Sequence, residues 1–192
     1  MPLKYSGNIR ELCYPFIYEE SALCDYEILT DELCTLVGCA ITELELDHRF
    51  ADICDFLEEL QPKMFHLNGS IRGKGSIHEE DIQRLDHYFD RFEQEIGGRI
   101  QSFVLPRGPR SVQLIHSCRS LCKKVVRCMV KIDAEGREVP DVLHRYANML
   151  CNLLFRLTVV INGRLGIREP EYISPNYPQR PPKKKRESSA TS

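Results

Sequence analysis

The feature that most constrains this chain is a series of five segments in which apolar residues recur every three or four positions. This spacing places the apolar side chains on one face of an α-helix, and glycine or proline marks most of the segment ends. We therefore expect helices over residues 26–46, 49–71, 76–96, 110–132 and 140–163. At ~1.5 Å per residue each helix would be ~30 Å long or more, which predicts an all-α, five-helix, up-and-down bundle.

Three local signals refine this prediction. Pro62 lies inside the second segment and should kink that helix, because proline lacks an N–H donor and crowds the preceding turn. Ser76 is the expected N-cap of the third helix, and Glu79, three residues later, would complete a capping box. The only signal for extended structure is a short stretch at residues 100–105.

Length and composition fit one soluble, intracellular domain. A chain of 192 residues is long enough for one full hydrophobic core, and no apolar run approaches the ~18 residues that span a bilayer. Lys4 and Arg10 are soon followed by several acidic residues, a pattern typical of neither a secretory signal nor a mitochondrial transit peptide. We therefore expect a cytoplasmic or nuclear location and no membrane partner.

The charge is unevenly distributed along the chain. Residues 166–192 hold six basic and three acidic residues, so the formal charge of −2 divides into +3 for this tail and −5 for the rest. An acidic body is poorly matched to a nucleic-acid backbone, so no nucleic-acid partner is expected. The proline-rich tail should be disordered or extended, and Lys183, Lys184, Lys185 and Arg186 form either a nuclear-import signal or a solubilising cluster.

Nine cysteines, an odd number, lie mostly in apolar helical patterns and are expected to be reduced thiols. Cys118 and Cys122 lie four residues apart with His116 nearby, but core packing explains them better than a metal site, so no metal is predicted. The glycine-rich stretch at residues 69–76 lacks the spacing of a phosphate-binding P-loop and no strand precedes it. It is interpreted as a loop between helices.

Three cations, Arg119, Lys123 and Arg127, recur every four residues on the fourth helix and so form one stripe beside its apolar face. Cations next to a buried surface are costly unless an anion faces them. Asp31 or Glu32, on the first helix, could supply that anion, or both could lie on a solvated helix face. The sequence leaves both interpretations open.

Taken together, these segments resemble the PduO-type ATP:cob(I)alamin adenosyltransferases. The resemblance rests on Thr30-Asp31-Glu32-Leu33 in the first helix and on the pattern of Leu57–Leu67 in the second. It continues in the loop Phe103-Val-Leu-Pro-Arg-Gly108 and in Cys118-Arg-Ser-Leu-Cys-Lys-Lys-Val-Val-Arg127 on the fourth helix. The match covers roughly residues 26–165 in unbroken order.

The resemblance implies a cobalamin adenosyltransferase-like bundle that forms a homotrimer, with sites between subunits. In that family ATP alkylates a corrinoid whose cobalt is four-coordinate. The matching Phe103 would fill the face from which the lower cobalt ligand leaves, and Arg119 and Asp31 would bridge neighbouring subunits beside the site. Lys123, Lys124, Arg127 and Asn148 match positions on the ATP side.

Departures from the family pattern concentrate on that ATP side. The residues before 26 lack the family's glycine- and threonine-rich triphosphate segment, and Val126 stands where the family has a glutamate. Two family arginines are Lys123 and Lys124, which cannot reproduce bidentate phosphate contacts. The fifth-helix pattern Asn-Arg-Leu-Ser-Asp reads His144-Arg-Tyr-Ala-Asn148.

These observations divide the chain into an N-terminal segment (1–25) without the ATP loop, a helical bundle (26–165) and a basic, proline-rich tail (166–192). The favoured interpretation is a catalytically degenerate family member, a pseudoenzyme that acts as an oligomeric scaffold or binds corrinoid or unidentified protein partners. The alternative is an active ATP:cob(I)alamin adenosyltransferase, for which ATP and cobalamin would be the cofactors. A weaker alternative is an unrelated bundle whose Pro178–Pro181 stretch recruits SH3- or WW-like domains.

Overall fold

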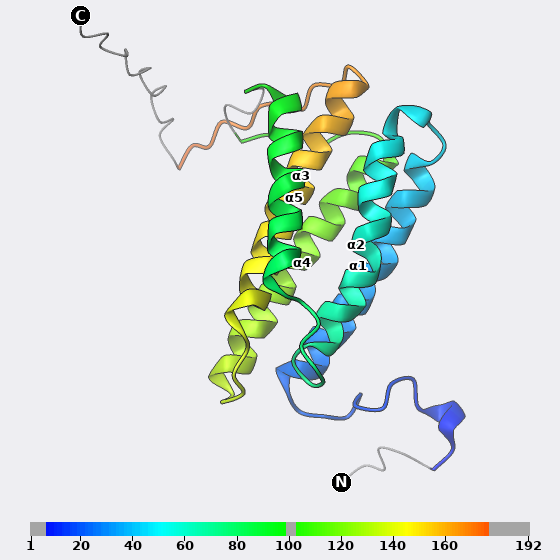
Figure 1. The fold of residues 1–192 in the computed structure, drawn as a ribbon, viewed down its shortest axis with the longest axis vertical. Helices are drawn as coiled ribbons and strands as arrows, with labels where there is room; N and C mark the ends of the chain where they lie inside the picture. The colour runs from blue at the N-terminus through cyan, green and yellow to red at the C-terminus, as the bar shows by residue number, and fades with distance from the viewer. Residues whose placement is uncertain (1–6, 99–102, 177–192) are drawn as a thin grey trace, which may run out of the picture.

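The computed structural model describes residues 7–98 and 103–176, and this part of the chain is dominated by five long α-helices (Figure 1). They are α1 (Ala22–Leu44), α2 (Ala51–Gly69), α3 (Glu79–Ile96), α4 (Arg110–Ala134) and α5 (Asp141–Arg164). Short 3-10 turns, Ile9–Glu11 and His48–Phe50, precede α1 and α2. Within the described ranges no strand forms apart from one isolated bridge, so the predicted all-α, five-helix fold is confirmed.

The helices pack along one another in the order α2, α1, α4, α5, α3. Aromatic side chains bring α2 and α3 together, because Phe56 contacts Tyr88 and Phe92 with ring centroids 4.4 and 5.9 Å apart. Each helix turns its apolar face inward, as its residue period requires. The fully buried side chains come from all five helices and include Tyr26, Leu33, Phe56, Met64, Phe92, Ile115 and Tyr146.

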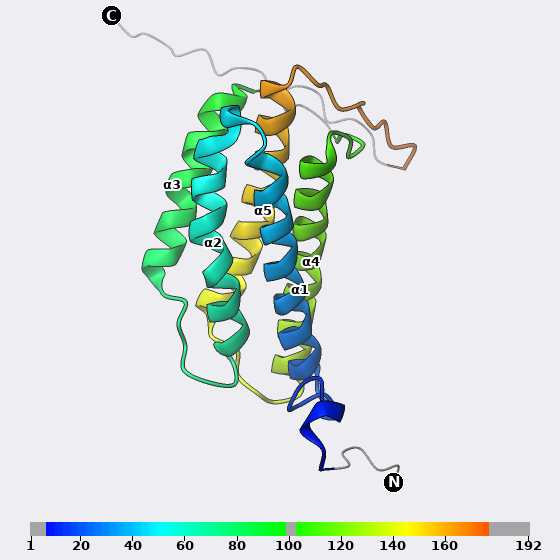
Figure 2. The same ribbon diagram turned by 90° about the vertical axis from the view of Figure 1, so that its right-hand side faces the viewer.

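The two ends of the bundle carry different non-helical segments (Figures 1 and 2). Residues 7–20 lie at the end where α1 begins, together with the α2–α3 loop. The loop before α4 and the segment after α5 lie at the opposite end. None of the helices in the described ranges is both long and apolar enough to cross a membrane.

Two predicted helix starts are wrong, and a side-chain contact explains each. The first helix begins at Ala22, one turn earlier than predicted, because the Glu135 carboxylate accepts the Ala22 N–H at 3.1 and 3.3 Å. The third begins at Glu79, because the Asp81 carboxylate accepts the N–H of His78 at 2.9 Å and makes His78 the N-cap. The predicted Ser76–Glu79 capping box therefore does not form. The second helix continues through Pro62 to Gly69.

The start of the predicted tail is attached to the bundle. Val104 and Glu171 form an antiparallel bridge, so residues 169–172 are extended alongside the loop before α4. The predicted extended stretch at residues 100–105 is thus confirmed at Val104, whereas residues 100–102 lie outside the described part. The basic cluster at residues 183–186 also lies outside it, and nuclear import stays a prediction.

The cysteines behave mainly as small core residues. All nine are free, and six are buried, including Cys118 and Cys122. Burial raises the pKa of the Cys118 thiol to about 12, so this thiol stays protonated and unreactive at neutral pH. No group of three potential metal ligands occurs in the residues that the structure describes.

Candidate functional site

The candidate site is built on α4, whose inward face is apolar and whose outward face is cationic. Val112, Ile115, Cys122 and Val125 are buried against the core, which fixes the rotation of the helix. That rotation leaves Lys123 and Arg127 exposed and Arg119 half-buried. The predicted cation stripe is therefore real, but only Arg119 carries the expected cost of desolvation.

Arg119 lies over α5 and has no carboxylate partner among the described residues. Its guanidinium carbon is 5.4 Å from the centroid of the Phe155 ring, a cation–π contact. Its Nε is buried and has no hydrogen-bond acceptor among the described residues. Asp31 is exposed on α1, and no described contact joins it to Arg119. A buried, unpaired donor costs about 1–3 kcal/mol, so an acceptor from outside the chain would be stabilising.

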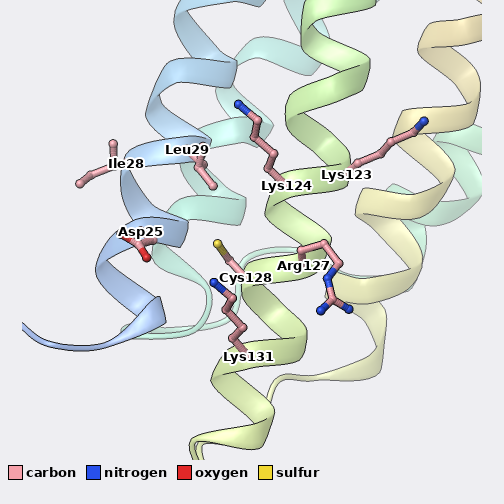
Figure 3. Close-up of a pocket in the computed structure, with 8 residues that line it drawn as sticks. All are labelled: Asp25, Ile28, Leu29, Lys123, Lys124, Arg127, Cys128 and Lys131. Carbon is pink, nitrogen blue, oxygen red and sulfur yellow. The ribbon is translucent and has the colours of Figure 1, made fainter.

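An open groove of about 480 Å³ runs between α1 and α4 (Figure 3). We call it the cationic groove, because α4 lines it with Lys123, Lys124, Arg127 and Lys131, whereas α1 contributes a single acid, Asp25. Its remaining lining residues are Ile28, Leu29 and Cys128.

The four cations of this groove are poised for an external anion. Figure 3 shows Lys124 and Lys131 reaching towards α1, whereas Lys123 and Arg127 lie on the side of α4 that faces α5. None of their side chains makes a hydrogen bond or salt bridge to another described residue. Cations without a described partner raise the local concentration of anions around the groove.

The fourth predicted ATP-side residue, Asn148, is not part of this groove. Its side-chain amide donates to the His144 carbonyl of its own helix at 2.8 Å, and the residue is exposed. The structure therefore brings Lys123, Lys124 and Arg127 together but leaves Asn148 apart. Val126, at the position of the family glutamate, packs half-buried against the core, so no anion orders the arginines of α4 there.

The neighbouring α5 residues are occupied by contacts within the chain. His144 Nε2 lies 3.0 Å from the Asp133 carboxylate, and Arg145 makes two hydrogen bonds to Glu79 at 2.8 and 2.9 Å. The backbone N–H of Val139 and the His144 ring together hold the pKa of Asp133 below its usual range. These side chains join α5 to the end of α4 and to the start of α3.

The loop before α4 presents Phe103 at the far end of the bundle. Phe103 is 80% exposed, although its loop is held by backbone hydrogen bonds. About 20 Å of helix separates Arg110, at the start of α4, from Lys123. The loop that carries Phe103 and the cationic groove therefore lie at different levels along α4.

Two contacts of the described chain were missed from the sequence. Arg72, in the glycine-rich loop, pairs with Glu19 and with buried Glu27 and lies 3.7 Å from the centroid of Phe16. His116 and Glu169 form a second buried contact, beside the Phe103 loop. The sequence contains these charged residues, but the partners in each pair are 45 to 53 residues apart, so no local pattern predicts the pairing.

Comparisons with known proteins agree with this architecture. Residues 28–161 match the family model described as cobalamin adenosyltransferase. The corrinoid adenosyltransferase of Bacillus subtilis (strain 168) is 28% identical over 147 residues, which cover 74% of this chain and 75% of that protein. The cobalamin adenosyltransferase of Cupriavidus metallidurans is 30% identical over 138 residues, covering 71% and 72%.

The fold is similar to that of solved PduO-type ATP:corrinoid adenosyltransferases from Lactobacillus reuteri. A phenylalanine-to-alanine variant complexed with cobalamin and ATP has a TM-score of 0.71 at 17% identity, covering 82% of this chain and 89% of that one. An arginine-to-lysine variant complexed with ATP has a TM-score of 0.71 at 18% identity, covering 81% and 90%. At such identity the similarity establishes the fold.

Proposed function

Because the chain belongs to the cobalamin adenosyltransferase family, we propose that it uses the family fold as an oligomeric scaffold that binds corrinoid or protein partners, without transferring an adenosyl group from ATP. The observation that carries the proposal is the separation of the ATP-side residues. Lys123, Lys124 and Arg127 share a groove, but Asn148 is turned to its own helix. Transfer from a triphosphate depends on densely placed, preorganised charge, and this set is incomplete.

The N-terminal segment supports the same proposal. Its Glu19 carboxylate is bound by Arg72 at 2.7 and 2.8 Å, and Phe16 lies under the same guanidinium. Residues 16–19 are thereby tied to the α2–α3 loop. None of these residues lines the groove between α1 and α4.

An active enzyme is the second candidate, and the cationic groove favours it. Four cations that lack a partner in the described part of the chain would bind ATP phosphates, and lysine serves as a point-charge phosphate ligand. The Lactobacillus reuteri relative also forms an ATP complex as an arginine-to-lysine variant. Lysine at a cationic position is therefore compatible with ATP binding in that relative.

Calorimetry of the full chain with ATP, and separately with cob(II)alamin, discriminates between the two candidates. We expect no measurable heat of ATP binding and no adenosylcobalamin under reducing conditions. Saturable ATP binding that Lys124→Glu abolishes and Lys74→Glu leaves intact would contradict the proposal and support the enzyme. Lys74 is the matched control because it is exposed on the α2–α3 loop, outside the groove.

The scaffold proposal includes a homotrimer in which Arg119 meets Asp31 of a neighbouring subunit. Asp31→Asn should lower the mass measured by light scattering at micromolar concentration, because it removes the negative charge that pairs with a half-buried guanidinium. Arg119→Ala should act in the same direction. Asp31 is exposed and has no described side-chain partner in its own chain, so its replacement does not weaken the monomer.

Arg110→Ala is the control for this experiment. Arg110 lies on the same helix but its side chain is 78% exposed, and its one ion pair among the described residues is with Glu43, at 3.3 Å. An unchanged oligomer in Asp31→Asn and Arg119→Ala would rule out the proposed pairing.

A further inference from the structure

The segment that follows α5 is fastened along the Phe103 loop by its backbone. The Leu105 N–H donates to the Pro170 carbonyl at 2.8 Å, and the Tyr172 N–H donates to the Phe103 carbonyl at 2.7 Å. Val104 and Glu171 bridge between these two bonds. The two segments therefore form a short antiparallel ribbon at the end of the bundle, and Phe103 projects from it.

A buried side-chain contact anchors this ribbon to α4. Glu169 Oε1 lies 3.3 Å from His116 Nε2, and the two side chains are only 5% and 7% exposed. The same carboxylate oxygen accepts the Arg107 N–H at 3.4 Å. A carboxylate is buried at high cost unless it is paired and hydrogen-bonded. Glu169 therefore stays buried only while it keeps its contacts with His116 Nε2 and the Arg107 N–H.

The loop is also held from below, by α5. The side-chain amide of Asn162 donates to the Arg107 carbonyl at 2.8 Å, and the backbone carbonyl of Asn162 accepts the Ile167 N–H at 2.8 Å. One α5 residue therefore contacts both the loop and the segment that covers it. The loop is fixed on two sides, yet it leaves Phe103 in solvent.

We propose that Ile167–Tyr172 is a strap that sets the conformation of the Phe103 loop, and that the buried contact between Glu169 and His116 is the latch that keeps it closed. Opening the latch frees the Leu105 and Tyr172 amides together, since both bonds join the strap to the loop. Glu169 is thus a positioning residue for Phe103. The inference goes beyond the proposed function, because it holds whether or not the chain binds ATP or corrinoid.

Amide hydrogen exchange of the full chain, followed by mass spectrometry, tests the latch. In Glu169→Ala the peptides that contain Leu105 and Tyr172 should exchange about tenfold faster or more, because a buried, charged hydrogen bond is lost. Exchange in the middle of α4 and α5 should not change. His116→Phe keeps a ring of similar size without Nε2 and should have the same local effect.

Glu171→Ala is the matched control, because Glu171 is an exposed glutamate of the same strap. A second readout uses the absence of tryptophan from the chain. A Phe103→Trp reporter should lose fluorescence anisotropy when Glu169→Ala is added. Unchanged exchange in both latch variants would overturn the proposal, as would an equal change in Glu171→Ala or faster exchange throughout the bundle.

Discussion

Arg72→Ala is expected to lower the free energy of unfolding by about 3–5 kcal/mol, an effect typical of breaking a buried ion pair from one side. Arg72 Nε lies 2.7 Å from Glu27 Oε1, and the Glu27 side chain is 3% exposed. Without the guanidinium, a carboxylate would remain buried without its cation. Chemical denaturation followed by circular dichroism measures the change.

The size of this effect depends on the burial of Glu27, and a second ion pair provides the control. Arg84 makes a similar two-pronged contact to Glu59, but the two side chains are 53% and 48% exposed. Arg84→Ala should therefore cost no more than about 1 kcal/mol, as exposed pairs do. Similar losses in the two variants would show that Glu27 does not depend on Arg72.

The Arg72 contact should also hold the N-terminal segment. Arg72 binds Glu19 and covers the ring of Phe16, and residues 16–19 would lose both contacts in Arg72→Ala. Adding Glu27→Gln to Arg72→Ala should recover part of the stability, because it removes the unpaired charge. The segment should nevertheless remain released, so trypsin should cleave at Arg10 faster in both variants than in the parent protein.

Gly108→Ala is expected to destabilise the protein by about 2–5 kcal/mol, because it combines backbone strain with overpacking. Gly108 has a φ of +152°, which side-chain-bearing residues rarely adopt. A β-carbon there would lie 2.5 Å from Asn162 Oδ1 and 2.8 Å from the Val112 side chain. Both neighbours are buried, so neither can move away easily. Thermal unfolding measures the loss.

Gly38→Ala is the matched comparison for this substitution. Its β-carbon would lie 2.6 Å from Gln61 Nε2, the far end of a flexible side chain. Gly38 is inside α1, where alanine is preferred over glycine by about 1 kcal/mol, so the net change should be close to zero. If Gly108→Ala were tolerated as well as Gly38→Ala, the close packing of the loop against Asn162 would be disproved.

The position of the Phe103 loop should change in Gly108→Ala as well. Asn162 would have to move, and it donates the hydrogen bond that holds the Arg107 carbonyl. Asn162 bonds both to the loop, at Arg107, and to the strap, at Ile167. We therefore expect faster amide exchange at Leu105 in Gly108→Ala. The same measurement thus connects the stability prediction with the proposed latch.

The sequence by itself determined the five helices and the cationic face of α4. Apolar periodicity is a local property, so it locates α2, α4 and α5 to within two residues of their ends. Lys123 and Arg127 are four residues apart on one helix, so helical geometry alone places them on the same side of it. Asn148 lies on α5, and the sequence pattern of α4 does not predict where the Asn148 side chain points.

Only the tertiary structure decided which charges are buried and which segments are held. The Glu135 carboxylate accepts the N–H of the first residue of α1, more than a hundred residues away in the sequence. Arg72 pairs with Glu19 and Glu27, and Glu169 contacts His116. The cost of burying a charge is set by what surrounds it, and those surroundings come from distant parts of the chain. For this reason a segment that composition assigns to the tail becomes a strap, and a glycine-rich loop carries the ion pair on which we expect much of the stability to depend.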